Sequence, residues 1–180
     1  MTKAAMFWID GIEETEAVAP ADLLRRAGVE LRIVSLMGAA CTVVGKHGLG
    51  LACEQTLDEF DGQVDMLILP GGTIDYLEHP DFLAVLRQAY ADGKRLAAIC
   101  AAPAVFGKLG LLQGKKAVCY PGMESHLEGA ELVEQPVVTD GNITTAKGPG
   151  VSIAFGLELI RVLLGEEQAR QVARDFIVDM

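Results

Sequence analysis

The chain has 180 residues and a formal net charge of −10; hydrophobic residues make up 51% of it and charged residues 22%. This composition predicts an ordered protein with one domain over residues 1–180. The acidic balance argues against a dedicated nucleic-acid binder, which needs a basic surface, and against attraction to an anionic membrane. The N-terminus lacks the pattern of a signal peptide, and no apolar stretch is long enough to cross a bilayer, so we expect a cytoplasmic protein.

The predicted elements alternate between strands and helices. Short apolar runs predict strands, and apolar residues at helical spacing predict helices. Pro20 falls inside the first helix and predicts that this helix starts late or is kinked. In chain order we expect a strand at 3–9, a helix at 15–27, a strand at 30–36, a hairpin from 41–44 and 49–53, a strand at 65–70, a helix at 80–91, a strand at 95–99, a short helix at 102–109, a strand at 116–120, a hairpin from 137–139 and 143–145, and helices at 151–164 and 166–176.

This alternation, with short connections, predicts a mostly parallel sheet covered on both faces. In such sheets ligands bind at the carboxyl ends of the strands. Three segments that follow predicted strands should meet at that edge: residues 9–16, residues 70–72 and Cys100.

Cys100 ends the apolar run of "AAICAAPA" (97–104), and Pro103 starts the next helix. A cysteine at a sharp turn before a helix N-terminus lies near unpaired backbone N–H groups, which favour the thiolate and hence a reactive nucleophile. The alternative is a buried inert thiol, because cysteine packs well in protein cores. The spacing alone leaves both interpretations open.

The other two segments have similar alternatives. Gly71 and Gly72 allow the backbone to approach a ligand and, with the N–H of Ala101, to bind a developing oxyanion, but they also suit an ordinary strand exit. The acids of "GIEETE" (11–16) complement the dipole of the following helix. One of them could instead turn toward the cysteine, as a protonated carboxyl that hydrogen-bonds a thiolate.

Cysteine and histidine spacing argues against a metal site. A zinc site needs clustered ligands, and in a cytoplasmic chain isolated thiols are expected to stay reduced. The residues concerned form no CxxC pair and are scattered: Cys41, Cys53, Cys100 and Cys119, and His47, His79 and His126.

Five motifs in this order and spacing resemble the DJ-1/ThiJ/PfpI superfamily, in its DJ-1/YajL-like branch, over essentially the whole chain. They are "GIEETEAV" (11–18), "LLRRAG" (23–28), "LPGG" (69–72), "AAICAAP" (97–103) and "KGPGVS" (147–152). The resemblance implies a flavodoxin-like three-layer sandwich with a mostly parallel central sheet, usually as a homodimer. It also implies that no cofactor is needed.

The resemblance implies roles for particular residues. It makes Cys100 the reactive cysteine and selects Glu16 as the carboxyl that hydrogen-bonds it. It places Gly71, Gly72 and Ala101 around the site as backbone donors. It brings Arg26 near the pocket of the partner subunit, and it matches Cys53 to an oxidisable cysteine at the dimer interface.

The chain departs from the family pattern at Tyr120, where the best-known animal members carry a histidine. A phenol has an unperturbed pKa of about 10 and is therefore a hydrogen-bond donor rather than a base at neutral pH. His126 could take the role of that histidine only if its loop folds back. Ala101 stands where the PfpI branch has histidine, which argues against peptidase or amidase chemistry.

The resemblance implies two functions. In the first, Cys100 attacks a small reactive aldehyde such as methylglyoxal to form a hemithioacetal, and Glu16 shuttles the proton that converts it to lactate; repair of glycated adducts (deglycase activity) is a related proposal. In the second, oxidation of Cys100 makes the protein an oxidative-stress sensor or a redox-regulated chaperone. The same accessible thiolate serves both roles.

Overall fold

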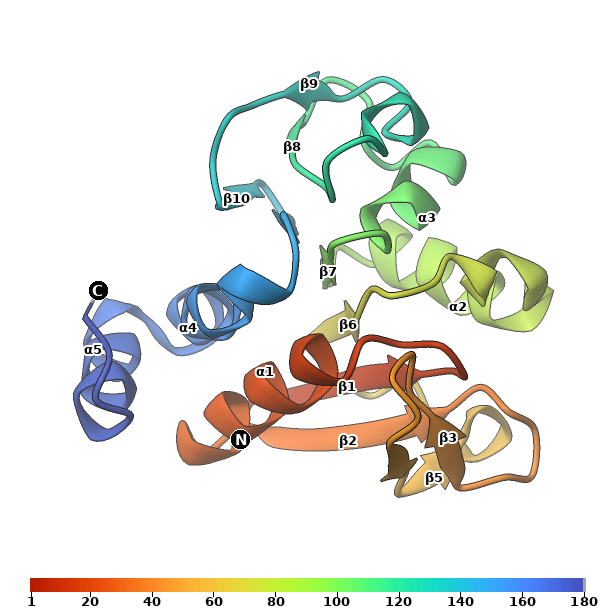
Figure 1. Ribbon diagram of the computed structural model, residues 1–180, viewed down its shortest axis with the longest axis horizontal. Helices are drawn as coiled ribbons and strands as arrows, with labels where there is room; N and C mark the ends of the chain where they lie inside the picture. Colours follow the sequence, from red (N-terminus) through yellow and green to blue (C-terminus); the bar gives the residue numbers. More distant parts are fainter. Residues whose placement is uncertain (180) are drawn as a thin grey trace.

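The computed structural model describes residues 1–179, which form an α/β structure around one large sheet (Figure 1). The seven strands of this sheet are arranged in the order β10-β11-β7-β6-β1-β2-β5. All neighbouring pairs are parallel except the antiparallel pair β10–β11. The prediction of a mostly parallel sheet is therefore confirmed.

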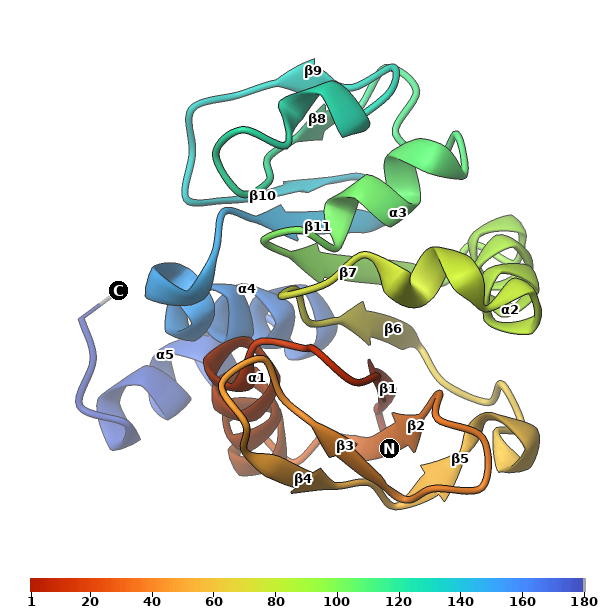
Figure 2. The same cartoon turned by 45° about the vertical axis from the view of Figure 1, so that its right-hand side comes forward.

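Helices cover both faces of the sheet and produce three layers (Figure 2). Helices α1 and α4 pack against each other on one face, and α5 packs on α4. Helices α2 and α3 lie against the other face, next to β7. The helices are α1 (Glu14–Arg26), α2 (Pro80–Ala91), α3 (Pro103–Lys108), α4 (Ser152–Leu164) and α5 (Glu166–Asp175).

The central strands are apolar because both of their faces are covered. All four residues of β6 are buried, as are the last five of β1. The strands of the large sheet are β1 (Lys3–Trp8), β2 (Glu30–Ser35), β5 (Gln55–Thr56), β6 (Met66–Leu69), β7 (Arg95–Ile99), β10 (Val137–Asp140) and β11 (Ile143–Ala146).

Local signals explain where several elements begin and end. The Glu13 side chain caps α1 by accepting a hydrogen bond of 2.8 Å from the Glu16 N–H, and α1 continues through Pro20 to Arg26. Of the two alternatives that Pro20 raises, a late start is wrong, because the cap at Glu13 starts the helix more than one turn before the proline. Gly141, at φ 61°, forms the turn between β10 and β11, which confirms the hairpin predicted from 137–139 and 143–145.

One predicted strand differs from the structure. The strand expected at 116–120 shrinks to β8 (Lys116–Ala117), which pairs with β9 (Glu131–Leu132) in a separate two-stranded sheet, because β10 fills the neighbouring position beside β11. The hairpin predicted at 41–53 is confirmed: β3 (Thr42–Val44) and β4 (Gly50–Ala52) pair in a two-stranded sheet of their own. Within residues 1–179, no helix is long and apolar enough to span a membrane.

Candidate active site at the carboxyl ends of β1, β6 and β7

Cys100 follows β7 in a backbone conformation that side chains rarely adopt. Its φ is 67°, and Ile177 is the only other non-glycine residue with positive φ in the described part of the chain. The conformation is fixed by the sheet on one side and α3 on the other, and the Cys100 N–H donates to the Ala146 carbonyl at 2.9 Å. Such strain is typical of nucleophiles held at strand–helix turns. The predicted sharp turn at Cys100 is confirmed.

Glu16 lies in the first turn of α1 and is fully buried. Its Oε2 accepts a hydrogen bond of 2.9 Å from the Gly71 N–H, while its buried Oε1 has no partner among the described residues. Burial raises the pKa of Glu16 to about 7, against the lowering effect of hydrogen bonds with Cys100 and Gly71. The carboxyl therefore holds its proton up to neutral pH, where an exposed glutamate would be ionised.

Burial also raises the pKa of the Cys100 thiol, to about 12, and the charge of Glu16 adds to this rise. The N–H groups of Gly72 and Ala101 act in the opposite direction. The expectation that the turn alone lowers this pKa is wrong, because burial beside a carboxyl outweighs the nearby N–H groups. A thiolate at Cys100 therefore requires the proton to reside on Glu16, so the two groups titrate as a pair.

Gly71 and Gly72 hold the backbone where a side chain would not fit. A Cβ on Gly71 would lie 2.5 Å from Cys100 Cβ and 2.6 Å from Glu16 Oε2. Gly72 has a φ of 93°, and a Cβ there would lie 2.4 Å from the Glu13 nitrogen. The Gly71 N–H is already used by Glu16, which leaves the N–H groups of Gly72 and Ala101 facing Cys100.

A cavity of about 340 Å³ opens onto Cys100, and Gly72, Ala101 and Tyr120 also line it. Tyr120 is half exposed, and its N–H donates to the Cys100 carbonyl at 2.8 Å. A larger cavity of about 690 Å³ lies elsewhere, between β10, α4 and the C-terminal residues. The described residues that line it include neither cysteine nor histidine.

Arg26 and His126 do not line the Cys100 cavity. Arg26 is exposed at the end of α1, where it pairs with Asp22 at 2.8 Å and stacks over the Phe176 ring. His126 belongs to a short 3-10 turn (Glu124–His126) that packs on α3, so its loop does not fold back to the cysteine.

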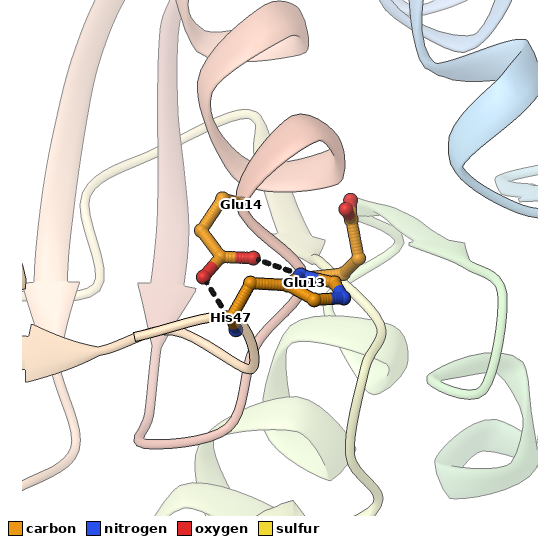
Figure 3. Close-up of side chains that lie close together, drawn as sticks. All are labelled: Glu13, Glu14 and His47. Carbon is orange, nitrogen blue, oxygen red and sulfur yellow. Dashed lines mark hydrogen bonds and ion pairs between the residues drawn. The ribbon is translucent and has the colours of Figure 1, made fainter. Parts of the chain in front are cut away.

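The cavity contains a histidine that the sequence analysis missed. His47 lies in the β3–β4 turn and lines the cavity with Lys46. The ring Nδ1 of His47 is 2.7 Å from Glu14 Oε2, and the backbone N–H of His47 donates to Glu14 Oε1 at 2.7 Å (Figure 3). Glu14 and His47 are 33 residues apart in the chain, so no local pattern indicates their contact. The only relevant signal in the sequence is the predicted hairpin, which places His47 in a turn.

Ligand atoms of Glu13, Glu14 and His47 lie within 4.8 Å of one another. Within this group His47 Nδ1 is hydrogen-bonded to Glu14, and Glu13 accepts a hydrogen bond from the Glu16 N–H. The Lys46 ammonium is also held nearby, at 3.1 Å from the Gly72 carbonyl. The hydrogen bonds make Glu14 and His47 a carboxylate–imidazole pair.

The fold and the site define a flavodoxin-like sandwich with a cysteine on a strained strand–helix turn beside a buried glutamate. The DJ-1/PfpI family model matches residues 2–162. The chain therefore belongs to the DJ-1/PfpI family.

Individual relatives agree with this assignment. DJ-1 homolog B of Arabidopsis thaliana is 36% identical over 94% of the chain, which spans 40% of that plant protein's length. The deglycase PH1704 of Pyrococcus horikoshii is 30% identical over 84% of the chain and 93% of its own length. The structure of oxidized Toxoplasma gondii DJ-1 superposes with a TM-score of 0.95 at 32% identity, covering both chains completely.

Proposed function

We propose that this protein converts small α-oxoaldehydes such as methylglyoxal to hydroxy acids without a cofactor. Cys100 serves as the nucleophile, and Glu16 carries the protons. The observation that supports this most directly is the buried Glu16 carboxyl, which holds a proton near neutral pH beside a cysteine on a strained turn. The relative named deglycase supports aldehyde chemistry in the family.

The reaction needs no outside oxidant. Cys100 Sγ adds to the aldehyde carbon while its proton, carried by Glu16, reaches the aldehyde oxygen, giving a hemithioacetal. Glu16 then takes the C–H proton and returns it to the neighbouring ketone carbon, and the hydroxyl proton passes to the ketone oxygen. The first carbon is thereby oxidised to a thioester and the second reduced to an alcohol. Water then releases lactate and restores the thiol.

The surroundings of Cys100 suit this sequence of steps. The N–H groups of Gly72 and Ala101 face the cysteine and can bind the oxygen that becomes negative after each addition. Tyr120 lines the same cavity and offers a phenol as a donor to the substrate. Ala101 offers no side-chain base next to the nucleophile, which disfavours peptidase or amidase chemistry.

We further propose a cytoplasmic homodimer in which Arg26 approaches the pocket of the second subunit. Arg26 is exposed and lies outside the Cys100 cavity of its own chain. A guanidinium from the partner would add a second positive charge beside that of Lys46, which lines the cavity.

The test compares lactate formation from methylglyoxal by the wild-type protein, Cys100→Ser and Glu16→Gln. We expect wild type to be active and both variants to be at background. Lactate formation by wild type that is no faster than by Cys100→Ser would refute the enzymatic function.

A second function, sensing of oxidants through Cys100, is supported by the same geometry. A sulfinate formed at Cys100 would accept a hydrogen bond from the protonated Glu16 carboxyl, whose Oε1 has no other partner among the described residues. Peptide mass spectrometry after mild peroxide treatment tests it. Oxidation of the exposed Cys41 or half-buried Cys53 before Cys100 would contradict this function.

A further inference from the structure

A carboxylate–imidazole pair places its imidazole, His47, in the wall of the Cys100 cavity and has no part in the steps above. The Glu14 side chain is 9% exposed and the His47 side chain 66% exposed. The two residues come from α1 and from the β3–β4 turn, and both hydrogen bonds between them are drawn in Figure 3.

The state of the pair follows from its hydrogen bonds. Burial raises the pKa of Glu14, but hydrogen bonds from His47 and Leu49 outweigh it and lower the pKa to about 2. Glu14 is therefore a carboxylate, which can only accept hydrogen bonds, so His47 Nδ1 must carry the proton. In the neutral ring this leaves a lone pair on Nε2, which lies on the side of the ring away from Glu14 (Figure 3).

The turn that carries His47 is held firmly on the site. The Lys46 N–H donates to the Ile12 carbonyl at 2.8 Å, and the Gly11 N–H donates to the Val44 carbonyl at 2.8 Å. These bonds join the hairpin to the loop that leads into α1. The imidazole is thus oriented by Glu14 and anchored through its own backbone, as the histidine of a catalytic triad is oriented by its carboxylate.

We propose that His47 is the general base that activates the water which hydrolyses the Cys100 thioester, with Glu14 as its positioning residue. This inference rests on the proposed aldehyde chemistry. His47 Nε2 takes a proton from water as the water oxygen bonds to the thioester carbon. The tetrahedral intermediate then breaks its C–S bond, and the departing Cys100 sulfur takes the proton back from the imidazolium. Lactic acid and the neutral imidazole result, so protons and electrons balance.

Glu16 and His47 differ in exposure, and this difference suits them to different steps of the reaction. Glu16 is fully buried and transfers the C–H proton of the substrate, a step that must exclude water. His47 lines the same cavity and is largely exposed to solvent. Tyr120 cannot replace it, because a phenol is too weak a base at neutral pH.

The experiment follows methylglyoxal turnover and the intact mass of the protein in His47→Asn. Loss of a general base is expected to lower kcat by about 100-fold or more. Because thioester formation does not need His47, the variant should accumulate a Cys100 thioester, which has the mass of one methylglyoxal and, unlike the isomeric hemithioacetal, releases a lactic hydroxamate when treated with hydroxylamine. Added imidazole should restore part of the turnover of His47→Ala, whose smaller side chain leaves room for it.

The matched control is His79→Asn, because His79 precedes α2, does not line the Cys100 cavity and should leave turnover unchanged when substituted. A wild-type rate in His47→Asn, or a slow rate without the Cys100 adduct, overturns the role of His47 while wild-type activity keeps the proposed function intact. A wild-type protein that forms no lactate overturns both.

Discussion

The pKa of Glu16 should make the stability of this protein fall as the pH rises toward neutrality. In the unfolded chain the carboxyl has its ordinary pKa of 4.5, and burial in the fold raises it to about 7. Between these pH values the native state holds a proton that the unfolded state has released, so the free energy of unfolding falls with pH. The contribution is complete below pH 4.5 and is lost as the pH passes 7; it amounts to ~3 kcal/mol.

Glu16→Gln isolates this effect because an amide has the shape of the carboxyl but does not titrate. Its oxygen can still accept the hydrogen bond from the Gly71 N–H. Urea denaturation of wild type and variant, at pH values from about 4.5 to 8, gives the difference in unfolding free energy at each pH. We expect this difference to move in favour of the variant by ~3 kcal/mol across that range.

The control is Glu128→Gln, which removes an exposed carboxyl paired with Lys108. The ion pair lowers the pKa of Glu128, so its titration lies below the range tested and its stability profile should run parallel to that of wild type. A constant difference between Glu16→Gln and wild type over the whole range would show that Glu16 is ionised in the native state and would refute the reasoning.

Two further substitutions test the packing of the site. Gly71→Ala should cost ~1–3 kcal/mol of stability by overpacking and abolish lactate formation, because the new Cβ would meet both Cys100 and Glu16; wild-type values in urea denaturation and the lactate assay would contradict this. Cys100→Gly should be more stable than Cys100→Ala by ~1 kcal/mol, because only glycine adopts the φ of 67° without strain; the reverse order in urea denaturation would show that the turn is not strained.

The sequence predicts much of this site because it depends on a simple pattern. Buried strands followed by turns, together with the rule that ligands bind at the carboxyl edge of a parallel sheet, bring Cys100, Gly71 and the loop before α1 together. The inward glutamate is also detectable in retrospect. Glu16, Pro20 and Leu23 share the buried face of α1 at helical spacing, so an acid stands in an apolar stripe.

The sequence does not predict His47, because its position depends on a long-range contact. No periodicity links the β3–β4 turn to α1, and the docking depends on the Glu14 carboxylate and on backbone bonds such as Lys46 to Ile12. The prediction of a lowered pKa for Cys100 is wrong for a related reason. A turn near a helix start predicts a lowered pKa, but the actual value depends on burial and on a carboxyl brought from another strand end.

The two glutamates of α1 show how local surroundings create different chemistry from one residue type. Glu14 and Glu16 share an ordinary pKa of 4.5, and their pKa values in the fold are about 2 and about 7. Glu14 accepts hydrogen bonds from the β3–β4 turn, which keep it ionised, whereas Glu16 has one N–H partner and is fully buried. Glu14 is therefore a permanent hydrogen-bond acceptor that orients an imidazole, and Glu16 is a proton carrier. Active sites with two carboxyls require such a separation of roles.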